Sequence, residues 1–127
     1  MGLNKDIFKG IVNKLVSGLN DVEVNASYNS KSTNKKSQVV INPPNITESD
    51  AVYDEGYVGE SIVNIDIEVY GVTLKQMDDI ADDVSSLLRQ NDIERLDYNG
   101  SSSAMNVITV NDNKYFGKVI TFTYLVN

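Results

Sequence analysis

The chain contains no cysteine and no histidine. The absence of cysteine excludes disulfides, thiolate metal sites and cysteine nucleophiles. The absence of histidine removes the commonest general base and the commonest metal ligand, so serine–histidine–aspartate triads and zinc sites are excluded as well. No run of about 18 apolar residues is present, and we expect no membrane-spanning helix. Residues 1–10 lack the apolar core of a signal peptide. These absences predict a non-enzymatic protein without cofactor or metal.

The 127 residues suit one domain, and we expect residues 1–127 to fold as a single unit. Hydrophobic residues make up 41% of the chain, which is enough to bury one core. The net charge of −7 is uneven: residues 1–42 hold six lysines against three acids, and the remainder holds five basic residues against fifteen acids. A chain with this acidic excess is not built to bind nucleic acid over its whole surface.

The first half of the chain predicts one helix and two strands. Residues 3–19 place apolar side chains at every fourth position, which is typical of an amphipathic helix packed on a core. Residues 22–28 are a predicted strand, and residues 29–38 a polar loop. Residues 39–41 predict a short strand that ends before two consecutive prolines. We expect the acidic residues 45–60 to be irregular.

Residues 61–70 alternate between apolar and polar side chains, which is typical of a strand with one buried and one wet face. The wet face is expected to carry Asn64, Asp66, Glu68 and Tyr70. A helix is predicted next. Its start is marked by the capping box Thr73-x-x-Gln76, and it runs to about Gln90.

After this helix, strands are predicted at residues 94–98, 106–110 and 118–126, with loops at residues 99–105 and 111–117. The expected order is a helix, two or three strands, a helix, and two or three strands (α-β-β-β-α-β-β). The predicted class is therefore α+β, with two helices packed on one face of a mainly antiparallel sheet of four to six strands.

The second predicted helix carries the sharpest local pattern, four aspartates at positions Asp78, Asp79, Asp82 and Asp83. Neighbouring like charges at i and i+4 cost about 0.2–0.5 kcal/mol per pair. A DDxxD pattern can bind magnesium that holds a diphosphate, but such enzymes need a deep apolar cavity and basic residues that this chain does not supply. We favour a solvated acidic face, followed by a subunit contact or DNA-repelling surface. A magnesium-dependent enzyme is the least favoured interpretation.

Three stretches carry a resemblance to a known family: IFKGIVNKLVSGLNDVEVNASY at 7–28, VNIDIEVYGVTLKQMDDIADDVSSLLRQ at 63–90, and GKVITFTYLVN at 117–127. In order and patterning they resemble the tail terminator proteins of long-tailed viruses of bacteria and archaea. The resemblance implies a sheet with two helices on one side. It also implies a structural virion protein that caps the head-proximal end of the tail tube as a ring and joins the tail to the neck. A tail completion or head-tail joining protein of the same neck would look similar.

The resemblance also implies partners and a location. The expected partners are other copies of the chain in a hexameric ring, the tail tube protein, and a neck or head-completion protein. DNA would pass through the ring without specific binding. The protein would be made in the host cytoplasm and end in the virion, in the tail or neck, with no membrane contact. A different class of function stays open, a small non-viral α+β interaction module that docks by a sheet edge.

Two contact hypotheses follow for a ring. Head-to-tail rings join two different patches, so we expect a basic loop of one subunit to meet the acidic helix of the next. That pairing joins Lys31, Lys35 and Lys36 to Asp78, Asp79, Asp82 and Asp83. Positive charge in the lumen would bind DNA phosphates, so acidic or neutral groups should line it. The lumen candidates are Asp50, Asp54 and Glu55.

Overall fold

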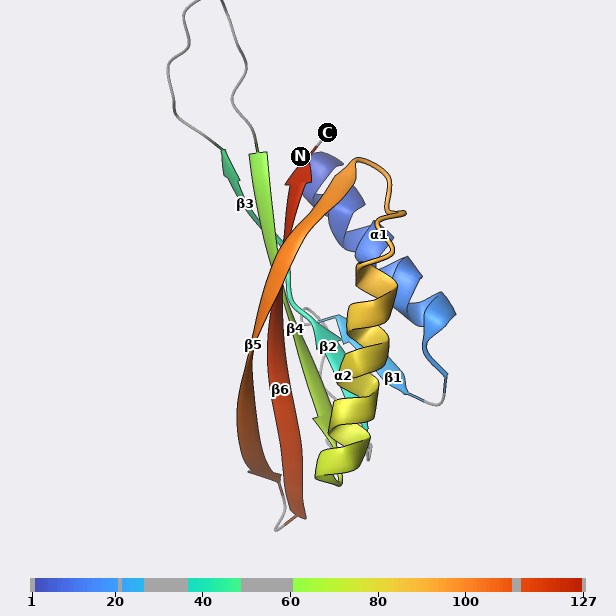
Figure 1. Cartoon of the computed structure of the whole chain (residues 1–127), viewed down its shortest axis with the longest axis vertical. Coiled ribbons are helices and arrows are strands. Elements are labelled where there is room, and N and C mark those ends of the chain that lie inside the picture. Colours follow the sequence, from blue (N-terminus) through green and yellow to red (C-terminus); the bar gives the residue numbers. More distant parts are fainter. Residues whose placement is uncertain (1, 21, 27–36, 49–60, 111–112, 127) are drawn as a thin grey trace, which may run out of the picture.

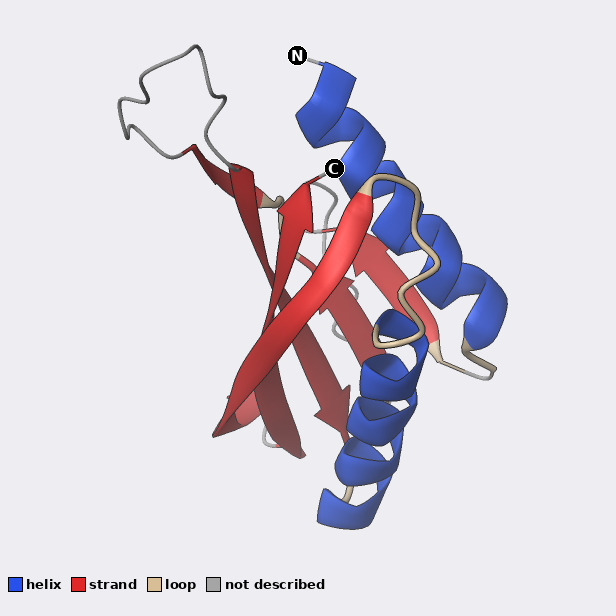
Figure 2. Cartoon of the chain, turned by 45° about the horizontal axis from the view of Figure 1, so that its top comes forward, coloured by secondary structure: helices blue, strands red, loops and turns tan. Residues whose placement is uncertain are grey.

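The computed structural model describes residues 2–20, 22–26, 37–48, 61–110 and 113–126. These residues form two helices and one six-stranded sheet, and both helices lie on the same face of the sheet (Figures 1 and 2). The predicted α+β class is confirmed. The helices are α1 (Gly2–Gly18) and α2 (Leu74–Leu88). The strands are β1 (Glu23–Ala26), β2 (Gln38–Ile41), β3 (Asn45–Glu48), β4 (Ser61–Gly71), β5 (Leu96–Val110) and β6 (Asn113–Val126).

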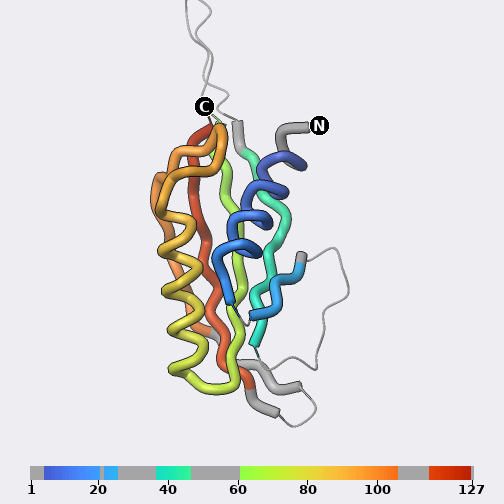
Figure 3. The backbone as a smooth tube through the Cα atoms, turned by 90° about the vertical axis from the view of Figure 1, so that its right-hand side faces the viewer, coloured from blue at the N-terminus to red at the C-terminus, as the bar shows by residue number. Residues whose placement is uncertain are grey.

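The sheet runs in the order β1-β2-β4-β6-β5, with β3 paired to β4 beyond the end of β2. Only β1 and β2 are parallel among the described pairs, and every other pair is antiparallel. The expectation of a mainly antiparallel sheet is therefore confirmed. Strands β5 and β1 form the two opposite edges of the sheet. Figure 3 shows α2 over the half of the sheet near β5 and α1 over the half near β1.

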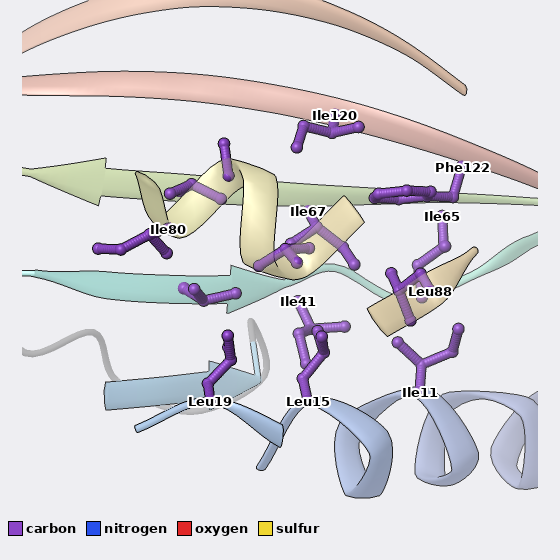
Figure 4. Packing of buried hydrophobic residues seen from close by; sticks show 14 of the residues in the cluster. Ile11, Leu15, Leu19, Ile41, Ile65, Ile67, Ile80, Leu88, Ile120 and Phe122 are labelled. Atoms are coloured by element: carbon purple, nitrogen blue, oxygen red, sulfur yellow. The ribbon is translucent and has the colours of Figure 1, made fainter. Parts of the chain in front are cut away.

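The core lies between the helices and the covered face of the sheet. In Figure 4, Ile11 and Leu15 of α1 point towards Ile41 of β2, and Leu88 of α2 lies near Ile65 of β4. The apolar stripes predicted from the sequence supply the buried helix residues. They are Ile7, Ile11 and Leu15 on α1, Leu19 directly after it, and Met77, Ile80, Ala81, Val84 and Leu88 on α2. Close packing on both helices buries the sheet's covered face, whereas the other face carries no helix and is buried only in part, at Val40 for example.

The capping box at the start of α2 forms as predicted. The Thr73 hydroxyl accepts a hydrogen bond from the Gln76 backbone N–H at 3.1 Å, and the Gln76 side chain accepts one from the Val72 N–H at 2.8 Å. The chain turns tightly before this cap. A side chain added at Gly71 would have its Cβ 2.7 Å from the Met77 backbone nitrogen, so glycine is required for this approach.

Two of the predicted irregular stretches are wrong. Residues 45–48 form the short strand β3, so four strands and not three precede α2. Residues 99–105 were expected to be a loop but lie inside the 15-residue strand β5, which pairs with β6 along its length. Serine and glycine favour turns locally, but cross-strand pairing with β6 overrides that preference. The register shifts between Tyr98 and Gly100, where Gly100 has φ 136°.

Strand β6 also begins earlier than predicted. It spans Asn113–Val126, so most of the loop expected at residues 111–117 belongs to the strand. The pairing Val110↔Asn113 makes β5 and β6 a long hairpin. This hairpin extends beyond Gly71, the last β4 residue that pairs with β6.

Candidate functional site

The face of the sheet that carries no helix, which we call the open face, presents a surface of polar and apolar side chains. The strand register places alternate residues on it. On the two central strands these are Ile62, Asn64, Asp66, Glu68 and Tyr70 of β4, and Tyr115, Gly117, Val119, Thr121, Thr123 and Leu125 of β6. The polar positions expected on the wet side of residues 61–70 are all found there.

Neutral groups hold the two central carboxylates of the open face. The Thr121 hydroxyl donates a hydrogen bond to Asp66 Oδ1 at 2.6 Å. The Asn42 side-chain amide donates one to Glu68 Oε2 at 2.9 Å. Because neither donor carries a positive charge, these bonds fix the carboxylates in place and leave their negative charge uncompensated.

Tyr70 is the second hydrogen-bond donor to Glu68, through its hydroxyl to Oε1 at 2.5 Å. Partial burial raises the pKa of Tyr70 above its usual value, and the neighbouring Glu68 carboxylate raises it further. The Tyr70 hydroxyl therefore keeps its proton and acts as a neutral donor throughout the physiological range.

Charge is segregated between the two sides of the sheet. Among the described side chains, the open face carries four acidic residues and no basic one. The acids are Glu23, Asp66, Glu68 and Asp97. The seven described basic side chains all lie on the helices, on the connection after α2, or on the covered face. They are Lys5, Lys9, Lys14, Lys75, Arg89, Arg95 and Lys118. The described charges of the open face are therefore all negative, which disfavours polyanions, whereas the helix side mixes both signs.

Two of the four aspartates of α2 already have partners within the chain. Asp78 Oδ1 lies 3.2 Å from Lys118 Nζ on β6. Asp79 Oδ2 lies 2.8 Å from Lys75 Nζ one helical turn earlier, and this hydrogen bond raises the pKa of Lys75. Both pairs are solvent-accessible, so each contributes little to stability.

Asp82 and Asp83 are exposed and form no ion pair with another described residue. They are the aspartates best placed to meet a partner. The predicted basic contact residues Lys31, Lys35 and Lys36 lie outside the described residues. So do the predicted lumen residues Asp50, Asp54 and Glu55. Both contact hypotheses therefore stay predictions.

A groove lies between the second half of α2 and the edge strand β5. Its volume is about 260 Å³, and its walls are Asp82, Ser85 and Arg89 on one side and residues 101–103 on the other. Lys118 and Ile120 of β6 complete the lining. The groove could not be predicted from the sequence, because its β5 wall falls in the segment that local composition assigned to a loop.

The described residues offer no group of three or more acidic side chains that could hold a metal ion. The aspartates of α2 thus do not converge in the way that the magnesium interpretation requires. Within the described part of the chain, neither helix is long and apolar enough to cross a membrane.

No protein-family model matches the sequence, and no curated protein matches it either. Solved structures do match the fold. The gp17 protein of bacteriophage SPP1 aligns over 100% of this chain and 93% of its own, with a TM-score of 0.63 and 18% identity. A chain from the virion of a native gene transfer agent particle aligns over 91% of this chain and 83% of its own, with a TM-score of 0.55 and 13% identity. At these identities the likeness shows a shared fold.

Proposed function

We propose that this protein is a structural component of a virus particle. In this proposal it is a ring subunit that caps the head-proximal end of the tail tube and joins the tail to the neck. The observation that carries the proposal is the fold match along nearly the whole of both chains to a bacteriophage protein, gp17 of SPP1. The second structural neighbour is a chain from the virion of a gene transfer agent particle. The resemblance of the sequence to tail terminator proteins supports the tail as the location.

The charge distribution supports a role around a DNA passage. A ring that DNA crosses needs a bore without exposed cations, since each lysine or arginine that neutralises a phosphate adds affinity. The open face meets this requirement, because its described charges are all acidic and its carboxylates are held by neutral donors. We therefore orient the open face towards the bore and the helices towards the outside. Asp50, Asp54 and Glu55 are proposed to add to the same acidic lining.

The proposed contacts of the ring are of three kinds. Each subunit contacts further copies of itself, a tail tube protein below and a neck or head-completion protein above. The basic residues Lys31, Lys35 and Lys36 are proposed to contact the acidic α2 of the neighbour, where Asp82 and Asp83 form no ion pair with another described residue. Exposed ion pairs contribute about 0–1 kcal/mol each, so apolar contacts must supply most of the association energy.

Labelling of particles tests the proposal. An antibody raised against the purified protein is imaged by electron microscopy on virus particles from the source of the gene. The proposal predicts label at the head-proximal end of the tail. Label at another part of the particle contradicts the capping role while leaving a structural one. Particles without any label contradict both and favour the interaction module that docks by a sheet edge.

A second labelling comparison separates a tail terminator from the alternative tail completion or head-tail joining protein. Tails that have not yet joined heads are labelled alongside complete particles. A protein that caps the tube is expected on free tails. A protein that enters with the neck is expected on complete particles and absent from free tails.

A further inference from the structure

Strand β5 forms a long edge, and beyond the bulge between Tyr98 and Gly100 it contains no charged residue or proline that would protect it. Its 15 residues contain one charged residue, Asp97, and no lysine or proline. Among the described residues it pairs only with β6, and its residues 101–105 are all exposed. Natural edge strands are usually shortened, charged or covered, because their free N–H and C=O groups pair readily with another strand. An unprotected edge of this length indicates a site where a strand is added.

The opposite edge of the same sheet is β1, which pairs only with β2 in the described part of the chain. Paired residues can be followed across the sheet from one edge to the other, and this shows which positions of β5 and β1 lie at the same level along the strands. One row of paired residues runs from Met105 through Lys118, Val69 and Val39 to Val24. Two rows further along, the row ends at Ser103 on β5 and at Ala26 on β1. If a second copy is placed edge to edge with the first and is not shifted along the strand direction, its β1 lies beside residues 103–105 of the first copy's β5.

Strand direction and side-chain face also agree with this pairing. Strands β1 and β6 run in the same direction, and β5 runs against both. A β5 edge beside the next copy's β1 is therefore antiparallel, the commoner and slightly more stable kind of pair. Met105 and Val24 both lie on the helix-covered side, Met105 by register and Val24 by its contact with the core. The pairing keeps all helices on one side of the extended sheet.

Exposed apolar side chains mark both edges. Met105 is 57% exposed on the β5 side. Val16 of α1 is also 57% exposed, and it lies two residues from Lys14, which bonds Gln90 and Asp92 beside α2. Two residues correspond to roughly 200° around a helix, so Val16 faces away from α2. Association along these edges covers both side chains.

We propose that neighbouring subunits are joined through their sheets. The β5 edge of one copy, at residues 103–105, pairs antiparallel with β1 of the next, and Met105 lies opposite Val24. The groove between α2 and β5 receives the α1 flank of the neighbour, which brings Val16 towards Asp82, Ser85 and Arg89. This inference rests on the proposed ring. It adds that the ring is a continuous sheet, with the open faces on the inside and the helices on the outside.

Cysteine cross-linking tests the pairing, because the chain has no cysteine of its own. The variant Val24→Cys with Met105→Cys is oxidised mildly and examined on a non-reducing gel. The two positions are four strands apart within one chain, roughly 19 Å, which is too far for an internal disulfide. Only adjacent copies can link them. The proposal predicts covalent multimers up to the size of the ring, reversed by reductant.

The matched control is Val24→Cys with Ser102→Cys. Ser102 is on the same exposed edge but its side chain faces the opposite side of the sheet. We expect at most a trace of cross-linking between positions 24 and 102 in this control. Equal linking in both variants overturns the register, and rings that form without the 24–105 link overturn the edge pairing while the proposed function stands. A protein that is monomeric at every concentration and gives no link also overturns the pairing; particle labelling then decides the proposed function separately.

A second variant tests the edge without cysteine. Met105→Lys places a charge on the edge strand and is expected to raise the concentration at which rings form by about tenfold or more. Val72→Lys is its control, because Val72 is also a large exposed apolar residue but lies in the turn before α2. Circular dichroism confirms that both variants fold. Equal assembly of the two variants contradicts the proposal.

Discussion

The covered and open faces are built from alternate residues of the same strands, yet different forces hold their side chains. On the covered face, Ile65 of β4 and Phe122 of β6 are paired in register and are fully buried under the helices. One residue along, Asp66 and Thr121 are paired in register on the open face and joined by a hydrogen bond. The comparison teaches that stability is concentrated on one side of the sheet, which leaves the other side free to vary in charge. Function can therefore be placed on the open face with little loss of stability.

The largest expected difference is between two neighbouring positions of β6. Phe122→Ala removes a fully buried ring and should cost about 3–5 kcal/mol of unfolding free energy. Thr121→Ala removes one accessible hydrogen bond and should cost about 1 kcal/mol or less. Urea unfolding of both variants measures the difference. Similar losses would show that the open face is covered in the folded protein.

The tyrosines provide the next comparison, with one on each face. Tyr124 is buried on the covered face, and its hydroxyl donates to the Leu88 carbonyl at 3.0 Å. Tyr124→Phe leaves that carbonyl unpaired and should cost about 1–3 kcal/mol. Tyr70→Phe on the open face should cost about 0.5–1.5 kcal/mol, because water can replace its hydroxyl as a donor to Glu68. Thermal unfolding of the pair checks the order, and a larger loss for Tyr70→Phe would reverse it.

The same tyrosines predict the behaviour at alkaline pH. Burial raises the pKa of both Tyr70 and Tyr124 above the unfolded value of 10.0. The unfolded chain therefore loses these protons first, so the stabilisation is complete below about pH 10 and is lost as the pH rises above it. Above about pH 10, the stability of each Tyr→Phe variant should decline less steeply with pH than that of the parent protein. An unchanged slope would indicate that the two hydroxyls are hydrated.

Charge reversal on each side of the sheet tests whether the open face lines the bore. Asp66→Lys puts a cation on the open face, and Asp82→Lys makes the same change of charge on α2. In assembled rings, Asp66→Lys should increase affinity for duplex DNA by about tenfold at low salt, with a steeper dependence on salt. Asp82→Lys should have a smaller effect, because its charge lies on the outside. Fluorescence anisotropy with labelled DNA measures both, and equal gains would contradict the inward orientation of the open face.

The smallest effect is expected at the exposed pair Lys75 and Asp79. The two side chains are one helical turn apart on the outer surface of α2 and are separated by 2.8 Å. Lys75→Ala should leave the melting temperature unchanged within error, because solvent screens the pair. A clear drop in melting temperature would mean that the outer surface of α2 contributes more to stability than its exposure indicates.

The sequence predicted those parts of the fold in which local pattern and tertiary packing agree. The alternation of residues 61–70 and the apolar stripe of α2 indicated both the elements and the faces they bury. Residues 45–48 and 99–105 were missed for the same physical reason. Short or serine-rich segments have weak strand preference, and they become strands because β4 and β6 offer them hydrogen-bonding partners.

The candidate site was only partly predictable for a related reason. The wet positions of β4 followed from alternation, so Asp66 and Glu68 were found on the correct face. The segregation of charge was not foreseen, because it depends on which face the helices cover and on where β6 places Lys118. The groove beside β5 depends on a strand that local composition assigned to a loop. Sites made by pairing between distant segments need the topology before they can be recognised.

Electron microscopy of the assembled ring, on particles or from the purified protein, tests the central claim most directly. The account predicts a closed ring at the head-proximal end of the tail, with the helices outside and Asp66 and Glu68 of every subunit facing the bore. A ring whose bore is lined by α1 and its lysines would contradict the account.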